Sequence, residues 1–334
     1  MRTKQHIMAL VCLLCSAYMS SCDVHEFPDP KPKPIDFTLE LNYDTNLPLY
    51  MIVEYEAETR NISTQEYDVR YIVKAFDAEA EGVQAHNELY HFEFVKDDIT
   101  ELNTSLVLSV IPGNYNFVVW TDYVKAGETT DLYYDTQQFE QIALCGSEHV
   151  GGNDFRDAFR GSIVSEVSAD VVEACVEMSR PMAKFNFIST DVEDFVVKVA
   201  SEGISPNGAD VNLSDYKAIF HYHGFMPYSY NMFTCKPADS KTGVSFEHNL
   251  SALSNGEAEL GFDYVFVNDG ESNVVVSVEI YDSNERMISS FKPIEVPLVC
   301  SKLTTVKARF LTSEAEGGVV VIPDYDGEYN YQIN

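Results

Sequence analysis

The stretch Ile35-Asp36-Phe37-Thr38-Leu39-Glu40-Leu41 decides the fold, because apolar and polar side chains alternate along it without a break. Successive side chains of a β-strand point to opposite faces of a sheet, so this pattern predicts a strand with one buried face and one solvated face. Further along, Pro112-Gly113-Asn114 supplies the backbone angles of a tight reversal. Strands and turns of this kind predict antiparallel sheets packed as a sandwich.

Similar runs recur on both sides of a reset in the pattern at Arg180-Pro181. Before it we expect strands at residues 51–55, 69–76, 91–95, 105–111, 115–123, 161–167 and 171–178, and one short helix at 153–159 capped by Asn153. After it we expect strands at residues 183–188, 195–200, 217–222, 244–246, 257–268, 273–281, 286–291 and 303–311. The chain is therefore predicted to be all-β, with two tandem antiparallel β-sandwich domains at residues 35–179 and 180–312 and the one helix in the first.

The N-terminal residues have the order of an export signal. Arg2 and Lys4 precede an apolar run at residues 7–19, which is too short to span a bilayer, and Cys22 follows directly behind small residues. We predict a lipoprotein signal peptide at residues 1–21 with the lipid attached to Cys22. The proline-rich residues 22–34 then form a semi-rigid tether. The alternative is an ordinary cleaved signal that leaves Cys22 as a plain thiol.

The charge balance restricts the class of partner. The chain carries 53 acidic and 22 basic residues, a net charge of −31, spread along its length. Such a protein is repelled by nucleic acid and by anionic lipid headgroups, so neither is expected as a partner.

Four cysteines follow Cys22 at positions 145, 175, 235 and 300. An even number in an exported protein permits two disulfides. Their apolar neighbours, as in Ile142-Ala143-Leu144-Cys145, favour buried free thiols instead.

Aromatic residues suggest one possible binding surface. Residues 221–233 are rich in aromatics, and Gly224, Pro227 and Ser229 predict an irregular loop there. The candidate ligand-binding aromatics are Trp120, Tyr123, Tyr222, Phe225, Tyr228 and Tyr230. The alternative is that the loop aromatics pack over an open end of a sheet.

The tail at residues 313–334 contains a second candidate site. A glycine-containing link precedes four apolar residues, Val319, Val320, Val321 and Ile322, which predict a short pairing strand. The strand is expected to pair either within its own domain or with the sheet edge of a neighbour. Pairing within the chain is favoured, because an unpaired apolar strand promotes aggregation.

Motifs of catalysis and cofactor binding are missing from the sequence. It contains no Gly-x-Ser-x-Gly elbow, phosphate loop, dinucleotide fingerprint or helical zinc-protease motif. Ser147 with His149 is a poor nucleophile pair, and His221 with His223 has no obvious third metal ligand. We predict no enzymatic activity, no cofactor and no metal.

Several longer stretches are similar to one family. They are residues 22–29, CDVHEFPD; 113–123, GNYNFVVWTDY; 157–161, DAFRG; 180–185, RPMAKF; 231–237, NMFTCKP; and 326–330, DGEYN. Together they resemble the fimbrillin-like outer-membrane lipoproteins of Bacteroidales, in an uncharacterised branch related to the anchor and tip proteins of type V pili. The resemblance implies transthyretin-like (immunoglobulin-like) sandwiches, a lipid anchor in the outer membrane with exposure at the cell surface, and a structural or adhesive role.

Two functional hypotheses follow. In the first, the chain is a non-enzymatic anchor or accessory subunit of a fimbria-like assembly, and its partners are fimbrial subunits bound by strand pairing. In the second, it is a surface adhesin that binds a glycan or protein through exposed aromatic rings. Burial of those rings would count against the second hypothesis.

Overall fold

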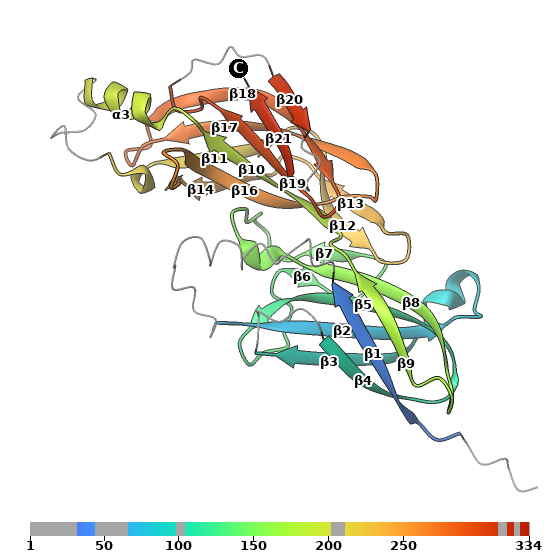
Figure 1. Ribbon diagram of the computed structural model, residues 1–334. Helices are drawn as coiled ribbons and strands as arrows, with labels where there is room; N and C mark the ends of the chain where they lie inside the picture. Colours follow the sequence, from blue (N-terminus) through green and yellow to red (C-terminus); the bar gives the residue numbers. More distant parts are fainter. Residues whose placement is uncertain are drawn as a thin grey trace, which may run out of the picture.

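Figure 1 shows the computed structural model of the chain, which describes residues 32–43, 66–97, 104–201, 211–312, 319–323 and 328–333. The strands gather into two bodies, the N-terminal one coloured blue to green and the C-terminal one mainly yellow to red. Cys22, most of the tether and the strand expected at residues 51–55 lie outside the described residues. Within these ranges no helix has the length and apolar character needed to cross a membrane.

The N-terminal body is a sandwich of a three-stranded and a four-stranded sheet. The first sheet has the order β4 (Thr104–Val110), β1 (Ile35–Tyr43) and β9 (Glu173–Met178). The second has the order β3 (Glu88–Lys96), β2 (Tyr67–Asp77), β5 (Gly113–Lys125) and β8 (Phe159–Val167). In β1 the predicted alternation is confirmed, since Phe37, Leu39 and Leu41 are buried and Glu40 is exposed.

The C-terminal body is a larger sandwich. Its six-stranded sheet has the order β15 (Ser251–Ala252), β16 (Ala258–Phe266), β10 (Met182–Ser189), β19 (Leu303–Ala308), β21 (Glu328–Ile333) and β20 (Val319–Pro323). Its four-stranded sheet has the order β14 (Ser245–Asn249), β11 (Lys217–Tyr222), β17 (Glu271–Tyr281) and β18 (Met287–Val299). The all-β class and the sandwich architecture are thus confirmed.

Both bodies repeat one topology. The first strand of each body, β1 or β10, pairs antiparallel with β4 or β16 and parallel with a later strand, β9 or β19. The facing sheets, β3-β2-β5-β8 and β14-β11-β17-β18, then match strand for strand and are antiparallel throughout. The parallel pairs depart from the purely antiparallel sheets expected, because alternation along a strand does not report the direction of its neighbour.

A small sheet joins the two bodies. It has the order β13 (Lys236–Lys241), β12 (Met226–Asn231), β7 (Ile142–Leu144) and β6 (Tyr134–Asp135). Along the chain, the β6–β7 hairpin belongs to the connection from β5 to β8 of the N-terminal body. The β12–β13 hairpin belongs to the connection from β11 to β14 of the C-terminal body. Ala143 pairs with Ser229 and Ile142 with Tyr230, so main-chain pairing connects the two halves of the chain.

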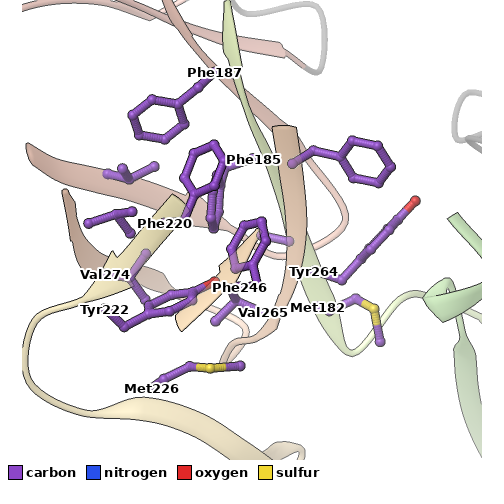
Figure 2. Packing of buried hydrophobic residues seen from close by; sticks show 14 of the residues in the cluster. Met182, Phe185, Phe187, Phe220, Tyr222, Met226, Phe246, Tyr264, Val265 and Val274 are labelled. Atoms are coloured by element: carbon purple, nitrogen blue, oxygen red, sulfur yellow. The ribbon is translucent and has the colours of Figure 1, made fainter. Parts of the chain in front are cut away.

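The apolar core is divided in an uneven way. One cluster, which contains Phe37, Leu39 and Phe117, fills the N-terminal sandwich. The second contains the C-terminal core and continues through Ile142 to Trp120, on the other side of the β2–β5–β8 sheet. Figure 2 shows the C-terminal part, where Phe185 and Phe187 of β10 lie close to Phe220 and Tyr222 of β11. The contact between the bodies is therefore a continuous apolar core.

One helix and one strand expected from the sequence are assigned wrongly. The helix expected at residues 153–159 is a single 3-10 turn, η2 (Asp154–Arg156), although the Asn153 side chain does accept from the Phe155 N–H at 3.0 Å. The strand expected at residues 195–200 is part of α3 (Val192–Ser201), the one α-helix of the described residues, and it lies in the second body. Its β-branched valines suggest a strand, but Phe195 and Val199 are buried four residues apart, which is helical spacing.

Further short elements complete the fold. They are the 3-10 helices η1 (Gly82–His86) and η3 (Leu213–Asp215). The stretch 221–233 was expected to be an irregular loop, yet it contains β12 and therefore belongs to the sheet that joins the bodies. The four cysteines after Cys22 are free thiols, of which Cys175 is exposed and the other three are half-buried.

Candidate functional site

Four of the six predicted binding aromatics are core residues. Trp120 and Tyr230 are 0 % exposed, and Tyr123 and Tyr222 are also buried. A ring needs an open face to stack on a ligand, so these four cannot form a binding platform in this structure. Figure 2 shows Tyr222 inside the packed C-terminal core.

Two of these buried aromatics bind acidic side chains through their polar atoms. Trp120 Nε1 donates to Asp122 Oδ2 at 3.0 Å, and the Tyr222 hydroxyl donates to Asp263 Oδ2 at 2.6 Å. The Trp120 ring also packs edge-on against Tyr134 at 5.3 Å between centroids. These side chains thus fix the interior, and the aromatic signal in the sequence was a packing signal.

The other two predicted aromatics are accessible. Phe225 is 76 % exposed and follows Gly224, which has a φ of +98° in the turn before β12. Tyr228 is half-buried, its hydroxyl donates to the Gly146 carbonyl at 3.1 Å, and Lys241 Nζ lies 3.2 Å from its ring centroid. Ligand binding by this pair stays a prediction.

The residues between β7 and β8 carry a set of buried ion pairs that sequence reasoning missed. We call this set the interdomain clamp: His149, Asp154, Arg156 and Asp157 on that segment, with Arg180, Lys184 and Asp263 on or beside the strands of the C-terminal body. The clamp has three acidic centres, at Asp263, Asp157 and Asp154.

Asp263 is the most deeply buried centre. It is 0 % exposed and accepts from Arg156 Nη1, from His149 Nε2 at 2.6 Å and from Tyr222. Burial acts to raise the pKa of the Asp263 carboxyl, but the positive charge of Arg156 and the contacts with His149 outweigh it, so the pKa lies below its ordinary value. The carboxylate is therefore ionised, and it binds β16 to the segment between β7 and β8 that carries His149 and Arg156.

Asp157 binds Arg180 in a bidentate pair. Arg180 Nε donates to Oδ1 at 2.7 Å and Nη2 donates to Oδ2 at 2.8 Å. The guanidinium also lies over the Phe159 ring at 4.6 Å. Because Arg180 lies two residues before the first strand of the C-terminal body, this pair fixes the chain where it passes from one body to the other.

Asp154 is the third centre. Its Oδ1 accepts from Lys184 Nζ at 2.7 Å and from the Tyr264 hydroxyl at 2.6 Å. Lys184 lies on β10 and Tyr264 on β16, two neighbouring strands of the six-stranded sheet. The clamp residues Asp157, Arg180 and Lys184 fall in the stretches 157–161 and 180–185 that carry the family resemblance, which was the available signal for them.

The C-terminal candidate strand pairs within its own chain. Val319, Val320, Val321 and Ile322 lie in β20, which pairs antiparallel with β21. In turn β21 pairs parallel with β19, over Leu303 to Lys307. The tail therefore extends the six-stranded sheet by two strands.

The corresponding edge of the N-terminal body is open. By topology β9 is the counterpart of β19, yet within the described ranges no strand lies on its outer side. Only its C-terminal end is closed, where Ser179 bridges to Arg160 of β8. The main-chain groups from Glu173 to Val176 thus form an unpaired strand edge, which we call the β9 edge.

The remaining polar candidates do not form a catalytic or metal centre. His223 Nε2 lies 2.7 Å from Ser277 Oγ, and His221 Nε2 lies 3.4 Å from Glu279 Oε2, so each histidine has a different neighbour. In the part of the chain that the structure describes, no three His, Cys, Asp or Glu side chains are grouped to hold a metal ion.

Comparison with solved structures gives alignments over most of the chain at low identity. A candidate adhesin from Bacteroides thetaiotaomicron is 12% identical, with 92% of this chain and 98% of that chain covered and a TM-score of 0.43. A fimbrial assembly protein from Parabacteroides distasonis is 12% identical, with 90% and 99% covered and a TM-score of 0.40. A candidate cell adhesion protein from Bacteroides ovatus is 15% identical, with 83% and 93% covered and a TM-score of 0.41. Alignments at this level do not establish a shared function.

No curated protein matches the sequence. A family match covers nearly the whole chain, including both bodies and the C-terminal hairpin: residues 31–334 match the family described as "Family of unknown function (DUF6562)", and the chain belongs to that family.

Proposed function

We propose that this protein is a non-enzymatic, lipid-anchored subunit of the outer membrane that joins a fimbria-like assembly as an anchor or accessory subunit. Cys22 carries the lipid, and the two sandwiches form one stiff unit held together by the interdomain clamp and the joining sheet. Its partners are subunits that donate or accept a β-strand. The chemistry of recognition is main-chain hydrogen bonding, with register set by alternate side chains.

The observation that carries this proposal is the difference between two equivalent edges. In the C-terminal body, β21 pairs in parallel with β19. In the N-terminal body, the equivalent β9 edge has no strand beside it among the described residues. Because the two bodies share one topology, a strand donated by a neighbouring subunit fits there in the same parallel direction.

The main-chain hydrogen-bonding pattern of β9, in which alternate residues bond to β1, makes the proposal testable. The Thr38 N–H donates to the Val172 carbonyl at 2.8 Å, so in this parallel pair residues 172 and 174 bond to β1. The N–H of Cys175 then points to the open side. Cys175→Pro removes that donor without removing a bond to β1, and Cys175→Ser is the matched control that keeps it.

The test is recovery of cross-linked partners from outer membranes that contain full-length wild type, Cys175→Pro or Cys175→Ser. We expect Cys175→Pro to lose stoichiometric partners by roughly tenfold and Cys175→Ser to keep them, since a blocked edge position costs at least one main-chain bond and its register. Circular dichroism checks that each variant is folded. Equal recovery by the two variants would exclude the β9 edge as the assembly site.

Surface binding by exposed aromatics is the second candidate, and the exposure of Phe225 favours keeping it. A 76 % exposed phenyl ring beside a glycine turn offers an apolar contact that water solvates poorly. Phe225→Ala should reduce adhesion of cells displaying the protein to a glycan-coated surface, whereas Cys175→Pro should not. The opposite pattern would favour the assembly role alone.

A further inference from the structure

The free edge of β14 borders a pocket of about 640 Å³ at the junction of the two bodies. One wall is residues 242–247, which lead into and form most of β14, and the opposite wall is the segment Ser147-Glu148-His149 from the N-terminal half. β14 is the outermost strand of its sheet, and its only strand partner among the described residues is β11. The pocket therefore runs beside an unpaired strand.

The pattern of hydrogen bonds between β14 and β11 shows which main-chain groups of β14 point away from β11. The Tyr222 N–H donates to the Val244 carbonyl at 2.9 Å, so Val244 forms a hydrogen-bonded pair with β11. In an antiparallel ladder such pairs alternate with pairs that point their main-chain groups outward, so Ser245 and Glu247 direct their N–H and C=O groups away from β11. No described residue provides a hydrogen-bond partner for these groups. They form a ready template for one more strand.

The edge also lacks the proline, the lysine and the bulge that commonly block strand addition. The β14 sequence, Ser-Phe-Glu-His-Asn, contains no proline or lysine, and its register with β11 has no bulge. The edge strand β13 differs, because it contains Pro237, Lys236 and Lys241 and its register with β12 is irregular. Of the two edges near the pocket, β14 is the one open to pairing.

The walls of the pocket are preorganised. Tyr228 holds the segment beside Ser147 through its hydrogen bond to the Gly146 carbonyl, and the Lys241 ammonium lies over the Tyr228 ring. On the same wall, Asp263 accepts from His149 Nε2 and fixes the imidazole. A ligand strand thus enters a groove whose shape is already set by the interdomain clamp.

The charge around the groove favours a basic ligand. Glu148 has no ion-pair or hydrogen-bond partner among the described residues, and Glu247 shares the Lys217 ammonium with Glu285, at 3.1 and 3.0 Å. Lys241 also lines the groove, with its ammonium over the Tyr228 ring. Around the groove the three carboxylates of Glu148, Glu247 and Glu285 outnumber the two ammonium groups of Lys217 and Lys241, on a protein whose net charge is −31.

We propose that this groove binds an extended peptide segment of a partner protein, paired as a strand with β14 and carrying a lysine or arginine side chain toward Glu148 and Glu247. This site is distinct from the β9 edge and does not depend on the assembly role. Main-chain bonds to Ser245 and Glu247 supply affinity, and the two carboxylates select the basic residue.

The probe is a fluorescein-labelled peptide of about seven residues that alternates valine with lysine, a pattern that places all lysines on one face of a strand. Three matched peptides serve as controls: one with glutamate in place of lysine, one with main-chain N-methyl groups on the side that faces β14, and one of scrambled order. Anisotropy is measured with full-length mature protein, Ser245→Pro, Ser245→Ala and Glu148→Gln. Ser245→Pro removes the outward N–H and leaves the ladder to β11 intact.

We expect saturable binding of the lysine peptide, a loss of roughly tenfold or more in Ser245→Pro, and a change within about twofold in Ser245→Ala. The N-methylated and glutamate peptides should bind at least roughly tenfold more weakly, and Glu148→Gln should weaken binding by about threefold.

If Ser245→Pro does not fold, the N-methylated peptide decides the question alone. Equal binding of the normal and N-methylated peptides, or no saturable binding, overturns the proposal. Self-association of the wild type that Ser245→Pro abolishes, without peptide binding, assigns the edge to a second copy.

Discussion

Asp157 and Arg180 form a bidentate ion pair at the junction of the two bodies, and each side chain is only 1% exposed. One residue precedes the last two strands of the N-terminal body and the other precedes the first strand of the C-terminal body. A buried pair of this kind couples two parts of a chain strongly, because neither charge can be left alone in the interior.

Asp157→Ala should therefore destabilise the protein severely. Removal of the carboxylate takes away the bidentate hydrogen bonds and the opposite charge that Asp157 gives to the buried Arg180 guanidinium, which costs about 3–5 kcal/mol in the free energy of unfolding. Urea unfolding of the wild type and the variant measures this loss. In the double variant Asp157→Leu with Arg180→Met, most of the stability should return, since no unpaired charge remains. A single variant as stable as the wild type would show that the pair is solvated.

The Asp263 centre predicts the pH dependence of stability. Its pKa is lower in the folded protein than in the unfolded chain, so its contribution is complete above the unfolded pKa of about 3.9 and is lost as the pH falls through the folded pKa. Urea unfolding between about pH 7 and pH 3 should show stability falling with acid, more steeply in the wild type than in Asp263→Asn. Asp263→Asn should also be less stable at neutral pH. Identical pH slopes for the two proteins would contradict this assignment.

The apolar cluster that continues between the bodies predicts cooperative unfolding. Trp120, the one tryptophan of the chain, lies on the face of the N-terminal body that contacts this cluster, whereas Phe187 lies deep in the C-terminal sandwich. Phe187→Ala should cost about 3–5 kcal/mol through the cavity it leaves. The midpoint seen by Trp120 fluorescence should shift by the same amount as the midpoint seen by circular dichroism. An unshifted fluorescence midpoint would show that the bodies unfold separately.

The domain boundary expected at residues 179 and 180 stays a prediction, and the same cluster bears on how to test it. Sheet membership changes between β9 and β10, which is where the pattern of the sequence resets. However, Arg180 is buried, and the chain there is held by Asp157. Limited proteolysis should therefore leave one compact body, and cleavage near residues 178–183 should appear only once the Asp157 pair has been removed.

The strands that sequence reasoning found are those that form one half-buried face of a sandwich, because alternation is a local signal. β1, β4 and β17 show this pattern and were expected within a few residues of their observed ends. The joining sheet was missed for the opposite reason. β6 has two residues and β7 has three, so neither is long enough to show an alternation of apolar and polar residues. In β12, Pro227 and Ser229 are residues typical of loops, so the sequence predicts a loop there.

The interdomain clamp could not be derived from the sequence, because its partners are distant. Arg156 and Asp263 are separated by 107 positions, and Asp157 and Arg180 by 23. Nothing local marks a charged residue as buried, and the general expectation for charged residues is exposure. The aromatics show the same limit, since a ring in a sequence indicates neither exposure nor burial.

The four free thiols should differ in reactivity. Cys175 on the β9 edge is exposed, whereas burial raises the pKa of the half-buried Cys145 thiol to about 11. The pKa of Cys175 is also raised, by slight burial and by the charges of Glu177 and Glu40, so its alkylation should be slow at neutral pH and should accelerate as the pH rises. Mass spectrometry after iodoacetamide treatment should find Cys175 modified first in the native protein. Prior modification of Cys145 would contradict the burial described.

Deletion of residues 313–334 tests the C-terminal hairpin. Without β21, the outer edge of β19 is left unpaired, as the β9 edge is in the N-terminal body. The two sandwiches keep their cores, so the truncated protein should fold, but the loss of main-chain pairing should lower the free energy of unfolding by about 2–4 kcal/mol. Thermal unfolding measures this change. If the hairpin is instead donated to a neighbour in the membrane, the truncated monomer keeps its midpoint and loses its partners. A variant with both an unchanged midpoint and unchanged partner recovery would show that β20 and β21 contribute to neither stability nor assembly.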